Sequence, residues 1–248
     1  MTLSKRAEDY NTRIFTPEMR RMQDAGGLDF HRGLHVGEPA PDFLVYDLDG
    51  TAIRLSDFRG QRHFVFGFGS ITAPIFVNDI PEYNRLHRKF CDKGIKVSVV
   101  YVREAHAAEG YRAHTSLEQK IAHARDLKRL EKLEAPLLVD SLEGDAHQLY
   151  GIRPNAVWGV NKDGRIFYKA TSLMPDDLAF VLESLLQAES LKAQGLRMRQ
   201  MYSESWIELG INRDVHERVL NRAGASARKE VTHAFGHDPV THGLKERS

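Results

Sequence analysis

The stretch 63–83 constrains the fold more than any other part of this chain. Aromatic and β-branched residues at 64–66 predict a buried strand, and a glycine-containing turn at 67–70 follows it. Beyond the turn, apolar residues recur at helical spacing, namely Phe76, Ile80 and Tyr83. A strand that feeds a helix through a tight turn brings free backbone N–H groups and the positive end of a helix dipole to one point. We therefore expect the site of any chemistry to lie at this turn.

The composition excludes several classes of protein. The chain has 248 residues, of which 42% are hydrophobic and 28% charged, as in ordinary globular proteins. The net charge of +1 gives no long-range attraction to nucleic acid or to a membrane surface. No apolar run approaches the roughly 20 residues that span a bilayer, and the first residues lack the apolar core of a secretory signal. We expect a cytoplasmic protein with no nucleic-acid partner and no membrane partner.

Cysteine and histidine patterns give no sign of a metal or of a cofactor. Cys91 is the single cysteine, which excludes an intramolecular disulfide and a site with several cysteine ligands. It lies beside the apolar side of a predicted helix, where cysteine more often packs as a small hydrophobe than acts as a nucleophile. His233 and His237 could share a metal within a helix, but Gly236 and Pro239 argue against a helix there. We expect a tail without fixed structure, and no metal or cofactor.

The predicted elements form an α/β domain with an addition at each end. We expect an N-terminal arm over residues 1–35, a domain over 36–192, and a helical extension with a polar tail over 193–248. The predicted strands cover residues 44–46, 52–55, 64–66, 95–102, 136–140, 157–160 and 165–168. The predicted helices cover residues 17–25, 76–92, 115–133, 146–150, 175–191, 197–209 and 214–222.

Two charged side chains follow the strand predicted at 95–102. Because the strand–helix–strand order implies parallel neighbours, Glu104 and His106 should emerge at the same edge of the sheet as Ala73. His106 can exchange a proton near neutral pH, with Glu104 as the partner that sets its tautomer. Alternatively, Glu104 pairs with a surface lysine and His106 caps the next turn. Arg103 alternates away from Glu104, and we expect it at the surface.

Three motifs resemble a known family. The segments FGSITAPIF at 68–76, YVREAH at 101–106 and SLEQK at 116–120 are similar to motifs of the iodothyronine deiodinase family, and the similarity covers about 36–186. The residues at 36–43 and 55–60 resemble the opening of peroxiredoxins and thiol-disulfide oxidoreductases. The resemblance implies a thioredoxin-like fold, with a central mixed sheet flanked by helices, and a pocket for a small aromatic molecule.

The residues that carry redox chemistry in the family are changed here. Family chemistry needs a selenolate or thiolate where Ala73 stands, and a methyl group cannot attack iodine or peroxide. Ile71 stands where many deiodinases keep a second cysteine. Ala156 occupies the place of the proline that thioredoxin-type proteins keep opposite the thiols, with Pro154 displaced by two residues. These changes favour natural loss of redox function over a variant in which Ala73 replaces a native cysteine.

We expect a non-redox enzyme that acts on a small, aromatic metabolite, with His106 and Glu104 as catalytic residues. The substrate-binding residues expected around them are Ser70, Thr72, Ala73, Phe76 and Arg153. Arg153 could hold a carboxylate or a phosphate, or could simply be a solvated loop residue. The alternatives are a thiol oxidoreductase whose cysteine has been replaced at position 73, and a binding module without catalysis. A homodimer is expected, formed through exposed apolar helix surface.

Overall fold

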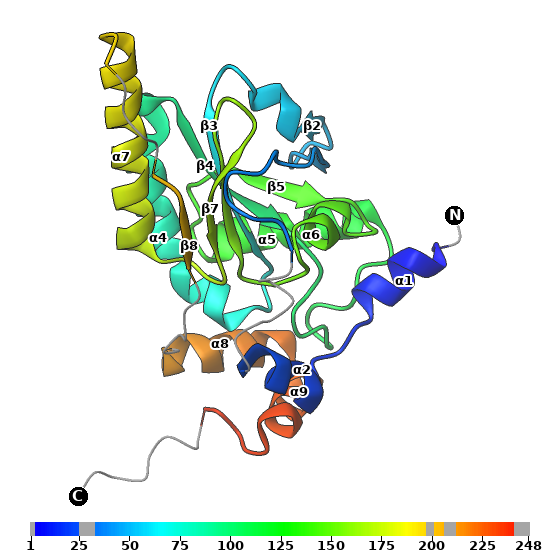
Figure 1. Ribbon diagram of the computed structural model, residues 1–248. Coiled ribbons are helices and arrows are strands. Elements are labelled where there is room, and N and C mark those ends of the chain that lie inside the picture. Colours follow the sequence, from blue (N-terminus) through cyan, green and yellow to red (C-terminus); the bar gives the residue numbers. More distant parts are fainter. Residues whose placement is uncertain (1–2, 25–32, 197–200, 206–211, 241–248) are drawn as a thin grey trace, which may run out of the picture.

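The computed structural model describes residues 3–24, 33–196, 201–205 and 212–240 (Figure 1). Within these residues the strands form one mixed sheet in the order β2-β1-β5-β4-β3-β6-β7-β8. The strands are β1 (Leu44–Tyr46), β2 (Ala52–Arg54), β3 (His63–Gly69), β4 (Ile95–Tyr101), β5 (Leu137–Asp140), β6 (Val157–Val160), β7 (Ile166–Ala170) and β8 (Ser203–Ser205).

The centre of the sheet has the topology of a thioredoxin-like fold. Strands β3 and β4 are parallel, with Phe66 opposite Ser98, and helix α4 (Pro74–Phe90) connects them. On its other side β3 pairs antiparallel with β6, which in turn pairs antiparallel with β7. A βαβ unit is thus followed by a β-hairpin and the closing helix α7 (Pro175–Ala193). The fold class expected from the sequence is confirmed.

Helices cover both faces of the sheet. Each face has its own buried apolar cluster. Helices α4, α5 and α7 contribute to one cluster, and α6 contributes to the other together with the extended segment before β1. Within the described residues, no helix is both long and apolar enough to cross a bilayer. The remaining helices are α1 (Lys5–Asn11), α2 (Pro17–Asp24), α5 (Leu117–Leu130), α6 (Asp145–Leu149), α8 (Arg213–Ala223) and α9 (Ala225–Phe235), with short 3-10 turns η1 (Leu55–Phe58) and η2 (Cys91–Lys93).

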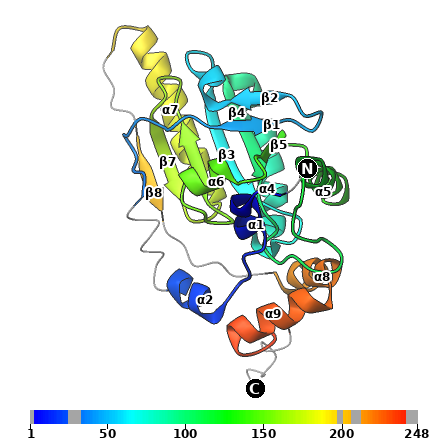
Figure 2. The same cartoon turned by 90° about the vertical axis from the view of Figure 1, so that its right-hand side faces the viewer.

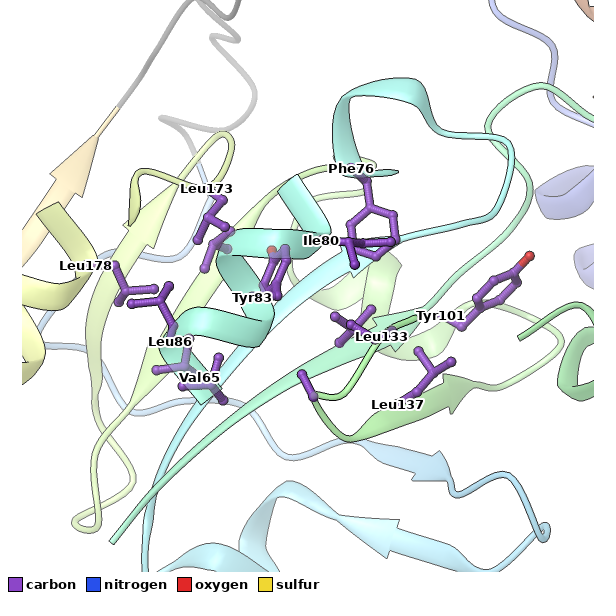
Figure 3. Close-up of a cluster of buried hydrophobic side chains, with 14 of the residues drawn as sticks. Val65, Phe76, Ile80, Tyr83, Leu86, Tyr101, Leu133, Leu137, Leu173 and Leu178 are labelled. Atoms are coloured by element: carbon purple, nitrogen blue, oxygen red, sulfur yellow. The ribbon is translucent and has the colours of Figure 1, made fainter. Parts of the chain in front are cut away.

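Alternation along β3 explains how this strand serves both faces. Its phenylalanines belong to the cluster around α6. Val65 belongs to the opposite cluster and points toward α4 (Figure 3). The two glycines of β3 also lie under α4, where a Cβ at Gly67 would stand 1.8 Å from the Tyr83 hydroxyl. A Cβ at Gly69 would lie 2.3 Å from the Phe76 ring. The glycines therefore allow α4 to pack directly on the strand that precedes it.

The C-terminal region differs from the sequence-based expectation. Within the helix predicted at 197–209, residues 203–205 form strand β8, which pairs in parallel with β7, and 197–200 and 206–209 lie outside the described residues. The helix predicted at 214–222 is confirmed as α8. The region expected to lack structure forms α9, because Ala227, Val231 and Ala234 pack with α8 in a small apolar core. Figures 1 and 2 show α2, α8 and α9 gathered below the sheet.

Candidate functional site

Two hydroxyl groups tie the loop after β3 to the loop after β4. The Ala105 backbone N–H donates to Ser70 Oγ at 3.1 Å, and the His106 N–H donates to Thr72 Oγ1 at 3.2 Å. Both hydroxyl-bearing residues are buried. The carboxyl ends of the two parallel strands therefore meet, as the sequence pattern predicted, and they bring these residues together.

The Glu104 carboxylate is the centre of a buried polar cluster. Thr72 Oγ1 donates to its Oε2 at 2.6 Å, and the Tyr101 hydroxyl donates to its Oε1. The ring nitrogens His114 Nε2 and His123 Nδ1 each lie 3.1 Å from the same Oε1. Burial alone would raise the pKa of Glu104, but the bonds to His114 and His123 outweigh it and hold this pKa well below its usual range. The carboxylate is therefore ionised although it is 1% exposed.

His106 has a partner that the sequence did not suggest. Its Nδ1 lies 3.3 Å from Glu230 Oε1 on α9, and the same carboxylate oxygen accepts the Phe15 N–H at 2.9 Å. The Phe15 ring contacts the imidazole edge-on, with 5.7 Å between centroids. The prediction that Glu104 pairs with His106 is therefore wrong: Glu104 turns inward to His114 and His123, and Glu230 faces His106. The prediction failed because it treated residue 230 as part of an unstructured tail.

The position that would carry a thiol, Ala73, is buried among apolar side chains. Ala73 is the N-cap residue of α4, is 3% exposed, and makes no side-chain cap bond. Ile71 and Phe76 are buried beside it in the same cluster. Cys91 follows the last residue of this 17-residue helix, so roughly 25 Å of helix separates it from Ala73. The single thiol of the chain cannot take over the position.

The remaining predicted residues lie on either side of this turn. The carbonyl of Ala156 accepts the Phe68 N–H at 3.0 Å, so Ala156 flanks the end of β3 as expected. Arg153 lies half-buried in the loop between α6 and β6, and its ligand-binding role stays a prediction. The surface position expected for Arg103 is wrong, because this side chain is 7% exposed and donates to the Arg13 carbonyl at 2.8 Å.

Three residues of the cluster escaped the sequence analysis. His114 precedes α5, His123 lies within it, and Asn11 comes from α1, with its Oδ1 3.2 Å from His114 Nδ1. A weak signal existed for the histidines, because His123 stands next to the apolar stripe of the helix predicted at 115–133. No local pattern could have linked Asn11 to them, since 103 residues separate it from His114.

Comparisons with known proteins found similar sequences and solved structures. A model of the iodothyronine deiodinase family matches residues 4–182. Thyroxine 5-deiodinase from Gallus gallus is 33% identical over 153 residues, which cover 57% of this chain and 58% of that protein. Type I iodothyronine deiodinase from Xenopus laevis is 27% identical over 190 residues, covering 71% of this chain and 74% of that protein. The chain thus spans little more than half the length of the chicken relative.

Among solved structures, the thioredoxin domain of a thiol-disulfide oxidoreductase from Bacteroides vulgatus has a TM-score of 0.49 at 21% identity. That match covers 62% of this chain and 99% of that domain. A putative thiol:disulfide interchange protein from Chlorobium tepidum has a TM-score of 0.48 at 19% identity, with 62% of this chain and 98% of that chain covered.

Proposed function

Because the chain belongs to the iodothyronine deiodinase family, we propose that it binds a small, aromatic molecule where β3 and β4 end and acts on it by acid–base chemistry. The reaction would use no redox thiol, because alanine stands at position 73 and the single cysteine lies at the far end of α4. What supports this proposal is the buried polar network at this edge, which joins Ser70 and Thr72 to Glu104 and to the backbone of His106.

Such a network is costly to bury. An ionised carboxylate loses its hydration inside a protein, and the bonds it gains often do no more than offset that loss. A core that served stability alone could fill this volume with apolar side chains at no loss. The retained network therefore favours a role in positioning, and the side chain that it positions is His106, whose N–H is held by Thr72.

In this proposal His106 is the proton-transfer group. The Glu230 carboxylate faces Nδ1, which favours a proton on that nitrogen and leaves Nε2 to take a proton from a ligand hydroxyl and to return it. The side chain of His106 is 12% exposed, whereas Glu104 has no exposed side-chain surface. We assign proton transfer to His106 and a positioning role to Glu104. Ser70, Thr72, Ala73 and Phe76 are buried, so we keep them as supports of this edge, and Arg153 as a proposed ligand contact.

The test compares His106→Gln with Cys91→Ser in the full chain. Thyroxine, the compound named in the chicken relative, and simple phenols serve as probes in thermal-shift measurements. A ligand that binds the folded state raises the melting temperature, because it adds RT ln(1+[L]/Kd) to the stability. We expect His106→Gln to lose the shift, or any turnover seen by chromatography, and Cys91→Ser to retain it.

Three results would count against the proposal. An unchanged response in His106→Gln would remove His106 from the reaction. Ligand binding without any conversion, by protein of the natural sequence, would favour the binding module instead. A cysteine codon at position 73 of the native gene would restore the redox alternative.

A further inference from the structure

Three potential ligand atoms converge inside the Glu104 cluster. Glu104 Oε1 lies 3.1 Å from His114 Nε2 and 3.1 Å from His123 Nδ1, and the two nitrogens are 3.2 Å apart. Each atom thus stands at hydrogen-bond distance from both of the others. Glu104 and His114 come from the loop that connects β4 to α5, and His123 comes from α5 itself.

The proton on His114 can be placed from its surroundings. The amide nitrogen of Asn11 donates to the Ala7 carbonyl and to the Leu142 carbonyl, both at 2.8 Å. The amide oxygen of Asn11 must therefore face His114 Nδ1, and an oxygen there can only accept. His114 consequently carries its proton on Nδ1, and in the neutral ring Nε2 presents a lone pair to Glu104 and His123.

Hydrogen bonds alone cannot satisfy this triangle with neutral rings. The proton on His123 Nδ1 can be donated to the Glu104 carboxylate or to His114 Nε2. In either case His114 Nε2 and Glu104 Oε1 face each other with lone pairs and no proton between them. A second proton on His114 or a cation bound to all three atoms removes the conflict, and the three converging atoms also have the geometry of a cation site. Metal-bound histidines commonly donate their second N–H to a protein oxygen, which is the arrangement of His114 and Asn11.

We propose that Glu104, His114 and His123 bind one divalent transition-metal ion, for which Zn²⁺ is the favoured occupant. Two imidazoles and a carboxylate are a ligand set typical of Zn²⁺ sites that keep a fourth position open. Tetrahedral bonds of 2.0–2.1 Å would separate the ligand atoms by roughly 3.3–3.4 Å, close to the separations found here. Mg²⁺ is disfavoured, since it prefers oxygen ligands.

The surroundings supply an outer shell for this site. Thr72 and Tyr101 donate to the carboxylate, and Asn11 orients His114. The buried Lys120 ammonium on α5 donates to the Ser141 carbonyl at 2.7 Å and so has a partner outside the cluster. The site shares Glu104 with the proposed acid–base function but does not include His106, so metal binding is measured separately from proton transfer.

The test uses the full chain after treatment with a chelator. ZnCl₂ and CoCl₂ are titrated by calorimetry, with MgCl₂ as the negative control, and Co²⁺ is followed by its visible d–d absorption. We expect saturable, equimolar binding of Zn²⁺ and Co²⁺, tetrahedral-type Co²⁺ bands, and a raised melting temperature with Zn²⁺. His123→Ala should weaken binding by about 100-fold or more, because even outer-shell partners contribute 10–100-fold.

Two further variants separate this site from other histidines. His233→Ala removes an exposed histidine of α9 and should leave binding unchanged. Asn11→Ala should weaken binding by about 10–100-fold through loss of the outer-shell bond. If Zn²⁺ and Co²⁺ do not bind, or bind equally to His123→Ala, the cluster is a hydrogen-bonded ion pair only and the proposal is overturned.

Discussion

At the residue scale, Thr72 joins the two halves of the site with a single hydroxyl. It donates to Glu104 at 2.6 Å while it accepts the His106 N–H at 3.2 Å. Valine has nearly the same shape as threonine but can do neither. Its introduction would leave a buried carboxylate with one fewer donor and a buried N–H with no acceptor, which is more costly than removing both partners.

We therefore expect Thr72→Val to lower the free energy of unfolding by about 2–4 kcal/mol, as the sum of one charged and one neutral hydrogen bond. Urea denaturation followed by circular dichroism measures this loss. Thr232→Val is the matched control, since Thr232 is a partly exposed residue of α9, and it should change stability little. Equal stability of the two variants would mean that the network adds nothing to the fold.

At the scale of elements, the loop after β4 is the platform on which the C-terminal helices dock. The Gly110 N–H donates to the Ala223 carbonyl at the end of α8, at 2.8 Å. The carboxylate of Glu131, 8% exposed, accepts from both Arg218 and Arg222 of the same helix. α9 then continues from α8 and places Glu230 against His106. The docking of α8 therefore decides whether the site receives its second carboxylate.

Gly110→Ala should loosen this docking. An added Cβ would stand 2.0 Å from the Arg222 carbonyl oxygen, a backbone atom that cannot move aside alone. We expect a loss of about 1–3 kcal/mol, as for other overpacked sites, and faster amide hydrogen exchange in α8 and α9. Exchange in β3 and β4 provides the internal control and should change less. Uniform loss of protection across the chain would contradict independent docking of the extension.

At the scale of the whole molecule, several buried histidines make the fold sensitive to acid. Burial lowers the pKa of His63, lowers that of His147 further, and lowers the pKa of His216 to about 4. The unfolded chain then binds more protons than the folded one below about pH 6.5, so stability rises with pH in this window and falls as the solution is acidified.

The expected homodimer stays a prediction. It would use exposed apolar helix surface such as Phe180 on α7, which is 56% exposed.

The free energy of unfolding should therefore decrease steadily between about pH 6.5 and pH 4. His216 alone should account for about 1–3 kcal/mol of this decrease, as an order of magnitude. Urea titrations at several pH values measure the slope, and His216→Leu should flatten it. A slope that is the same with and without the substitution would show that His216 is protonated equally in both states.

The sequence by itself determined the fold class, the meeting of the loops after β3 and β4, and the absence of a thiol at position 73. These features follow from hydrophobic periodicity and from short motifs, which involve only residues that are close together in the sequence. Most predicted strands and helices were recovered for the same reason. The stretch 203–205 was not, because its strand forms only through pairing with β7, which no local pattern reveals.

Only the tertiary structure decided which partners the site residues have. The ring of His106 meets a carboxylate 124 residues later in the chain, and Glu104 meets two histidines instead of the one beside it in sequence. Asn11 reaches the same cluster from the other end of the chain. A hydrogen bond requires atoms that are close in space, not in sequence. The packing of α1, α8 and α9 on the domain brings these distant residues together. The contacts of the candidate site therefore depend on segments from both ends of the chain as much as on the family motifs.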